Sequence, residues 1–123
     1  MKKHDEFVTY LLELMQPLGP VSARAMFGGY GIYIDDIMFA LVADDVLYLK
    51  TNQKTLPEFE QRGLSPFHYE RNDKSYNMSY CEAPEEFMED PEAMRYWSNM
   101  AIEAALKNKR RKKYGEKTRK KSG

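Results

Sequence analysis

Three short apolar runs follow one another between residues 30 and 50. They are Tyr30–Ile34, Ile37–Ala43 and Val46–Lys50, and each has the length and the Ile, Val, Tyr and Phe content of a β-strand. The aspartate pairs Asp35-Asp36 and Asp44-Asp45 separate the runs, and aspartate tolerates the left-handed backbone of a two-residue hairpin loop. The pattern therefore predicts a three-stranded antiparallel meander.

Helices are predicted on both sides of this meander. Before it, apolar residues recur at helical spacing from about Asp5 to Gln16, and Pro17 follows directly. After it, a short helix is expected around Thr55–Arg62, because Pro57 suits the first turn of a helix and Gly63 suits its C-terminal end.

The second half of the chain indicates one more hairpin and a final helix. The segments Phe67–Arg71 and Ser75–Cys81 alternate between apolar and polar residues, with a turn expected at Asn72-Asp73. Asp90 is expected to cap the final helix, and Gly115 is the first residue expected to end it. Part of the basic C-terminal run would then be helical.

The resulting order is α-β-β-β-α-β-β-α, without the alternating βα units of a parallel sheet. We therefore expect an α+β fold of two layers, with helices packed on a five-stranded antiparallel sheet built from residues 25–50 and 67–81. The first and last helices are expected to bury Phe7, Leu11, Trp97 and Ala101 on this sheet, with Phe39 and Leu41 among the central strand residues.

Composition narrows the class of protein. The chain has 123 residues, of which 42% are hydrophobic, and this suits one folded domain with one core. Cys81 is the only cysteine, so no intramolecular disulfide can form, which fits a reducing compartment. No apolar run approaches the roughly 18 residues of a membrane helix, and polar residues follow Lys2-Lys3 where a secretory signal would be apolar. We expect a cytoplasmic protein without a membrane partner.

The formal net charge of zero conceals two oppositely charged parts. Residues 107–123 carry ten Lys or Arg against one Glu, a charge of +9, whereas residues 1–106 carry nine basic and eighteen acidic side chains, a charge of −9. We therefore expect a domain over 1–106 and a basic tail over 107–123, and the tail suits weak contact with nucleic-acid phosphates. The tail residues expected to contact nucleic acid are Lys109, Arg110, Arg111, Lys112, Lys113, Arg119, Lys120 and Lys121.

Catalytic and cofactor motifs give no convincing candidate. Gly28-Gly29-Tyr30-Gly31 lacks the spacing of a phosphate-binding loop and enters a strand, so close backbone packing or a bulge is the favoured interpretation. His4, His68 and Cys81 do not have the spacing of metal ligands, and Cys81 has no orienting histidine nearby in the sequence. We expect no catalytic residue, no metal and no cofactor.

The tyrosines of the strands invite comparison with a nucleic-acid stacking platform. Such platforms combine aromatic rings with a basic groove, and these strands carry few cations. Sheet core and a subunit interface explain the rings better. The run Ile37–Ala43 is apolar at every position, and helices on one side of a sheet cannot cover both of its faces, so a homodimer is a further hypothesis.

The segment MFGGYGIYIDDIMFALVADDVLYLK resembles the signature of the TfoX N-terminal domain family, found in bacterial competence regulators. The segments FHYER and SYNMSYCEAPEEFMED, together with a final helix that carries Trp97, extend the resemblance to roughly residues 5–107. The positions that match the family motif are Arg24, Met26, Phe27, Gly28, Gly29, Tyr30 and Gly31.

The resemblance implies a five-stranded antiparallel sheet covered by helices, and a part in transcriptional control. In that family the part is the induction of DNA-uptake competence alongside a DNA-bound activator. We therefore expect a non-enzymatic regulatory protein that contacts a protein partner such as an activator or the transcription machinery. The alternative is a stand-alone nucleic-acid-binding module that acts through its tail. Arg24 either contacts an acidic partner or is a salt-bridged or solvated charge, and the second interpretation is favoured.

Overall fold

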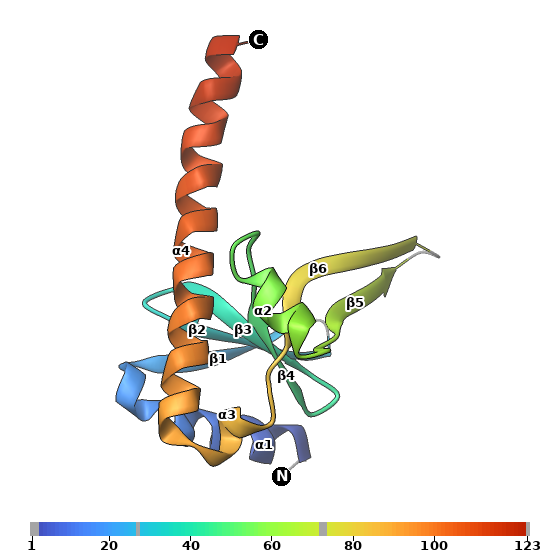
Figure 1. Cartoon of the computed structure of the whole chain (residues 1–123), viewed down its shortest axis with the longest axis vertical. Coiled ribbons are helices and arrows are strands. Elements are labelled where there is room, and N and C mark those ends of the chain that lie inside the picture. Colours follow the sequence, from blue (N-terminus) through green and yellow to red (C-terminus); the bar gives the residue numbers. More distant parts are fainter. Residues whose placement is uncertain (1–2, 27, 72–73, 123) are drawn as a thin grey trace.

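The computed structural model describes the backbone of residues 3–26, 28–71 and 74–122, and the side chains of residues 6–26, 28–68 and 78–107. The strands form one sheet in the order β1-β2-β3-β4-β6-β5, and every neighbouring pair is antiparallel (Figure 1). The bounds of the strands are β1 Val21–Met26, β2 Gly29–Ile34, β3 Ile37–Ala43, β4 Val46–Lys50, β5 Pro66–Arg71 and β6 Lys74–Glu82. The α+β class and the antiparallel sheet predicted from the sequence are confirmed.

The sheet has six strands, one more than predicted. The additional strand is β1, which pairs with β2 from Val21 opposite Ile34 to Met26 opposite Gly29. Its sequence, VSARAM, consists mainly of small residues around one arginine, so its apolar signal is weak. Pairing along the whole of β2 supplies the backbone hydrogen bonds that the strand needs.

The two aspartate hairpins are formed as predicted. The backbone φ angles are +48° at Asp35 and +64° at Asp36, and +51° at Asp44 and +60° at Asp45. Positive φ at both central residues is the requirement of a type I′ turn, whose twist matches that of the flanking strands. The turn predicted at Asn72-Asp73 lies outside the described residues.

The helices differ from the predicted bounds mainly at their ends. They are α1 Lys3–Leu14, α2 Leu56–Gln61, α3 Glu86–Glu89 and α4 Pro91–Ser122, with a 3-10 turn, η1 Gln16–Leu18, after α1. Asp90 caps α4 as predicted, because its Oδ1 accepts a hydrogen bond from the Glu92 N–H at 3.0 Å. Gly115 does not end α4, contrary to the expectation. A single glycine within a helix costs about 1 kcal/mol, which the helix-forming lysines, arginines and glutamate around it can offset.

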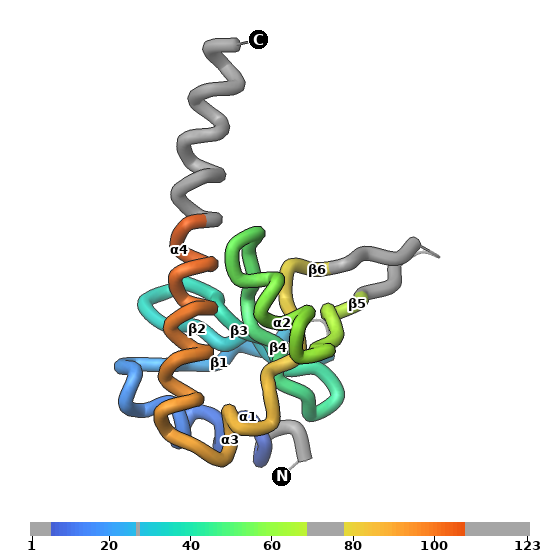
Figure 2. The backbone as a smooth tube through the Cα atoms, in the orientation of Figure 1, coloured from blue at the N-terminus to red at the C-terminus, as the bar shows by residue number. Residues whose placement is uncertain are grey.

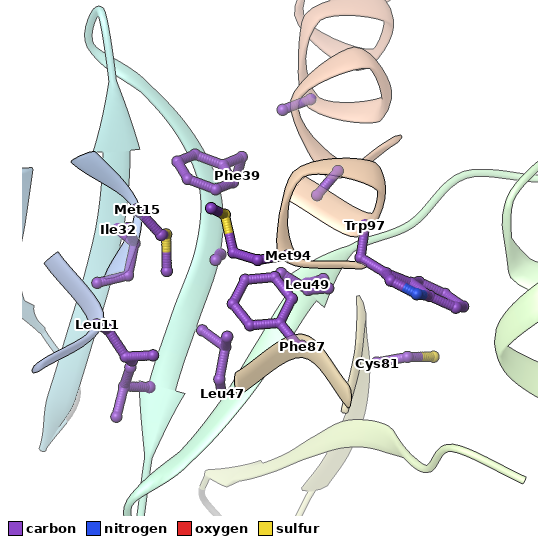
Figure 3. Packing of buried hydrophobic residues seen from close by; sticks show 14 of the residues in the cluster. Leu11, Met15, Ile32, Phe39, Leu47, Leu49, Cys81, Phe87, Met94 and Trp97 are labelled. Carbon is purple, nitrogen blue, oxygen red and sulfur yellow. The ribbon is translucent and has the colours of Figure 1, made fainter. Parts of the chain in front are cut away.

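The helices share one hydrophobic core on one face of the sheet. The core includes Leu11 of α1, Phe59 of α2, Phe87 of α3 and Trp97 of α4. Figure 2 shows α1 and α3 near the first turns of α4, which crosses the sheet at β3 and β4. In Figure 3 the side chains of Met94 and Phe87 lie against the sheet residues of the same core.

The predicted core residues are found in place. Leu11, Trp97 and Ala101 are buried in the core cluster, and Phe7 is half-buried against it. Phe39 and Leu41 lie in the central strand β3, where Phe39 faces the core and Leu41, although buried, lies on the opposite face. A register shift between β2 and β3 at Phe39 explains why consecutive apolar residues of β3 can be buried on the same face. Ile32 lies opposite Ala40 and Tyr33 opposite Met38, so Phe39 is an extra residue in β3. Both Phe39 and Ala40 belong to the core cluster as a result.

Candidate interaction surface

The glycines of the family motif shape the junction of β1, β2 and β3. Gly28 has φ +76°, which favours glycine. A Cβ atom at Gly29 would lie 2.0 Å from the Val42 carbonyl oxygen, and one at Gly31 would lie 2.8 Å from the Met26 Sδ. The motif therefore permits close packing of strands, as the sequence interpretation favoured. Phe27 lies outside the described residues.

The sheet face opposite the core carries its own set of side chains, which we call the open face. Residues directly opposite one another in an antiparallel pair share a face, and Gly31 pairs with both Arg24 and Leu41, which in turn pairs with Tyr48. None of the open-face side chains belongs to the helix-covered core cluster. The open face includes Ser22, Arg24, Met26, Gly31, Tyr33, Met38, Leu41, Tyr48, Lys50, Tyr80 and Glu82.

Arg24 lies on the open face between an aromatic ring and a carboxylate. Its guanidinium carbon is 4.5 Å from the centre of the Tyr33 ring, and its Nη2 donates to Asp36 Oδ1 at 3.0 Å. The salt bridge, one of the two forms that the favoured sequence interpretation allowed, is therefore present. Both charged side chains are well exposed, at 59% for Arg24 and 84% for Asp36, so water screens the pair and its stabilising effect is small.

A second cation and more aromatic rings extend the open face toward β6 and β5. The Lys50 ammonium lies 5.0 Å from the centre of the Tyr80 ring, and the Tyr48 ring packs edge-on against Phe67 at 5.0 Å. Burial raises the pKa of Tyr80 to about 12, with a further contribution from Tyr33. Burial, followed by the charges of Glu82 and Asp44, also raises the pKa of Tyr48. These tyrosines are therefore neutral hydrogen-bonding aromatics at physiological pH.

A polar cluster joins α2 to α3 and α4 on the other side of the molecule. The Tyr96 hydroxyl donates to the Glu58 carboxylate at 2.9 Å, and Arg62 donates to Glu86 while lying 5.7 Å from the centre of the Trp97 ring. The hydrogen bond from Arg62 lowers the pKa of Glu86. These contacts hold α2 over the start of α4.

Of the sequence candidates for chemistry, His68 lies opposite Asn77, four residues along β6 from Cys81, and the side chain of His4 lies outside the described residues. Cys81 is buried in the core, and burial, followed by the charge of Glu60, raises the pKa of its thiol. His68 is exposed on β5. Among the described residues no group of three or more His, Cys, Asp or Glu is placed to hold a metal ion. Within the same part of the chain, no helix combines the length and the apolar character needed to cross a membrane.

The basic tail belongs to the same helix as the folded body. Helix α4 runs without interruption from Pro91 to Ser122, so the backbone of every cation predicted to contact nucleic acid is helical. The side chains of residues 108–123 lie outside the described ones, and their contacts with nucleic acid stay a prediction.

Comparison with known proteins identifies the family. The chain matches the TfoX N-terminal domain over residues 13–105, a range that holds the glycine motif, both aspartate hairpins and the start of α4. The chain belongs to the TfoX N-terminal domain family. The resemblance found in the sequence is therefore confirmed.

Two curated relatives have the following degrees of similarity. The chain is 28% identical over 96 residues to DNA transformation protein TfoX1 of Aliivibrio fischeri (strain ATCC 700601 / ES114). This match covers 78% of the chain and 44% of the relative. The chain is 27% identical over 97 residues to Protein Sxy of Escherichia coli (strain K12), and this match covers 79% of the chain and 46% of the relative. The matched part of the chain thus spans less than half the length of these relatives.

The contacts of Arg24 with Tyr33 and Asp36 were not predicted from the sequence, although a signal for them exists. Strand alternation places every second residue on one face, so Arg24 and Tyr33 could have been assigned to the open face once β1 was recognised. Because β1 was not predicted as a strand, Arg24 was not assigned to a face of the sheet.

Proposed function

We propose that this member of the TfoX N-terminal domain family is a non-enzymatic cytoplasmic regulator of competence-type transcription that acts through protein–protein contacts. The observation that carries the proposal is the family match over residues 13–105. One similar protein is named a DNA transformation protein, which agrees with a part in DNA uptake. Because the match covers less than half of that relative, the transfer of its activity to this chain is itself proposed.

The chemistry of the open face supports a protein partner. Arginine and tyrosine are enriched among the residues that dominate binding energy in protein interfaces. On the open face Arg24 is held over Tyr33, and Lys50 over Tyr80, in fixed positions on strands. Tyr80 is already buried, but Tyr33 and Tyr48 are half-buried, and a partner could cover their rings without first ordering a loop, which lowers the entropic cost of binding.

The state of the thiol supports a non-enzymatic role. The thiolate is the reactive form of cysteine, and burial together with the charge of Glu60 raises the pKa of Cys81. At neutral pH the sulfur is therefore a protonated thiol within the core.

A genetic experiment tests this function. The gene is deleted in its native strain, and both transformation frequency and the transcripts of DNA-uptake genes are measured with and without a restored copy. Deletion should lower both quantities, and the restored copy should recover them. Unchanged transcripts and transformation in the deletion strain would contradict the proposal.

The charge of the C-terminal part favours a second candidate, a nucleic-acid-binding module. Residues 107–123 carry a net charge of +9, and α4 continues through them to Ser122. If about five of these cations contact phosphates of duplex DNA, the log–log slope of affinity against salt should be near −4.5, from about 0.9 per phosphate.

Truncation after Leu106 separates the tail from the domain. It should abolish DNA binding and leave the core intact, because the core side chains all lie before residue 107. Binding of the full and truncated chains is compared on two unrelated duplexes, at about 50 and 200 mM salt. Affinity that survives truncation, or a preference for one duplex that does not depend on salt, would show that the tail is not responsible.

A further inference from the structure

A cavity of about 480 Å³ lies between α2, the segment that follows β4, and the strands β5 and β6. This volume is within the range of ordinary ligand sites. Its apolar walls include Leu56, Leu64 and Met78, and polar groups come from Thr51, Ser79 and Glu60. These residues belong to different elements, so no single sequence motif reveals the site.

Thr51 offers a hydroxyl to the cavity that the described part of the chain leaves without a hydrogen bond. The residue is only 5% exposed, and its backbone N–H donates to the Ser79 carbonyl at 2.9 Å. Among the described residues, every fully enclosed side-chain oxygen has a hydrogen-bond partner. The Thr51 hydroxyl has none in this part of the chain, so it is not fully enclosed, and Thr51 lines the cavity, from which the hydroxyl is reached. A hydroxyl both donates and accepts, and a bound group can therefore use it.

Glu60 gives the cavity a negative charge. It is the one charged residue among the cavity's lining side chains, and no ion pair engages it within the described chain. Its carboxylate is close enough to Cys81 to contribute to the raised pKa of that thiol. The nearby Arg62 is already paired with Glu86. A cation that enters the cavity could therefore pair with the Glu60 carboxylate without displacing another cation from it.

The loop that forms one wall is held in place by its own hydrogen bonds. The Asn52 Oδ1 accepts from the N–H groups of Lys54 and Thr55, both at 2.9 Å, and the Asn52 N–H donates to the Thr55 hydroxyl at 3.0 Å. A wall fixed in this way keeps Thr51 in position before a ligand arrives, which favours binding.

We propose that this cavity binds the side chain of an arginine presented by a protein partner. The guanidinium would donate to the Glu60 carboxylate and to the hydroxyls of Thr51 and Ser79, and its planar array of five N–H donors suits several acceptors at once. Its methylene stem would pack on the apolar walls. The −9 charge of residues 1–106 attracts a basic partner over longer range.

This inference rests on the proposed function and names the chemistry of the partner. NMR titration of the ¹⁵N-labelled full chain tests it, with N-acetyl-arginine methylamide as the probe and the neutral N-acetyl-citrulline methylamide as its matched control. Saturable shifts should appear at the amides of Thr51, Ser79 and Cys81. The citrulline compound should bind about tenfold more weakly, because it lacks the charge that strengthens hydrogen bonds to a carboxylate.

Two variants make the test specific. Glu60→Gln should weaken the arginine probe about tenfold, whereas Glu103→Gln, at an exposed position of α4 outside the cavity, should leave binding unchanged. Equal binding of the two probes, undiminished binding to Glu60→Gln, or shifts confined to another surface would each overturn the proposal. Such a result would leave the regulatory function standing, because the transcript measurement decides that function independently of the cavity.

Discussion

The close approach of β2 and β3 at Gly29 gives a sharp test of what the family motif does. A Cβ atom added there would lie 2.0 Å from the Val42 carbonyl oxygen and 3.2 Å from its carbon. Both atoms are backbone and cannot rotate away, so Gly29→Ala must separate the strands by roughly 1 Å. Overpacking costs about 1–3 kcal/mol, and a weakened hydrogen bond adds about 1 kcal/mol. We expect a total loss near 3 kcal/mol in the free energy of unfolding.

Gly28→Ala is the matched control, since it changes the adjacent glycine in the same way. A Cβ atom at Gly28 would meet nothing within 4 Å, and only its φ of +76° opposes the substitution. That conformation costs an alanine about 1–2 kcal/mol. In urea, with a slope of about 1.5 kcal/mol/M, Gly29→Ala should lower the unfolding midpoint by about 2 M and Gly28→Ala by about 0.7–1.3 M. An equal or smaller shift for Gly29→Ala would refute the packing role.

Three further measurements test other parts of the structure. The pKa of Tyr80 is raised to about 12 from an ordinary value of 10.0, so the folded state favours the neutral phenol. The free energy of unfolding should therefore fall by up to about 3 kcal/mol as the pH rises from 10 to 12. Tyr80→Phe should remove this part of the pH dependence, and an unchanged pH profile in the variant would contradict the assignment to Tyr80. The thiol of Cys81 should react with a disulfide reagent far more slowly in the native protein than in urea, because it is buried and its pKa is raised; similar rates would show that the core is open. If the open face mediates a homodimer, sedimentation at micromolar concentrations should depend on concentration, and a constant 14.5 kDa monomer would refute it.

The hairpins were predictable because their chemistry is local. Asp35 and Asp36 supply the positive φ angles of a tight turn whatever surrounds them, and the same holds for Asp44 and Asp45. The helix caps are local in the same way, as the Asp90 hydrogen bond shows. Features of this kind can be read from four or five neighbouring residues.

Features that depend on distant partners were not predictable. Strand β1 exists because β2 offers it hydrogen bonds along its length, and VSARAM alone carries little strand signal. The uniform apolar run of β3 concealed a bulge at Phe39, which is defined only by the register with β2. The cavity requires α2 to be placed over β6, so Thr51 and Glu60 had no common signal in the sequence.

The claim that the folded domain acts through a protein partner is tested most directly by affinity capture from a nuclease-treated extract of the native cell. The full chain and a chain ending at Leu106 are immobilised and compared. We predict that both retain the same protein at similar levels, since the partner contacts the domain formed by residues 1–106. Retention that occurs only in an extract not treated with nuclease, or that requires residues 107–123, would contradict the claim and favour the nucleic-acid-binding alternative.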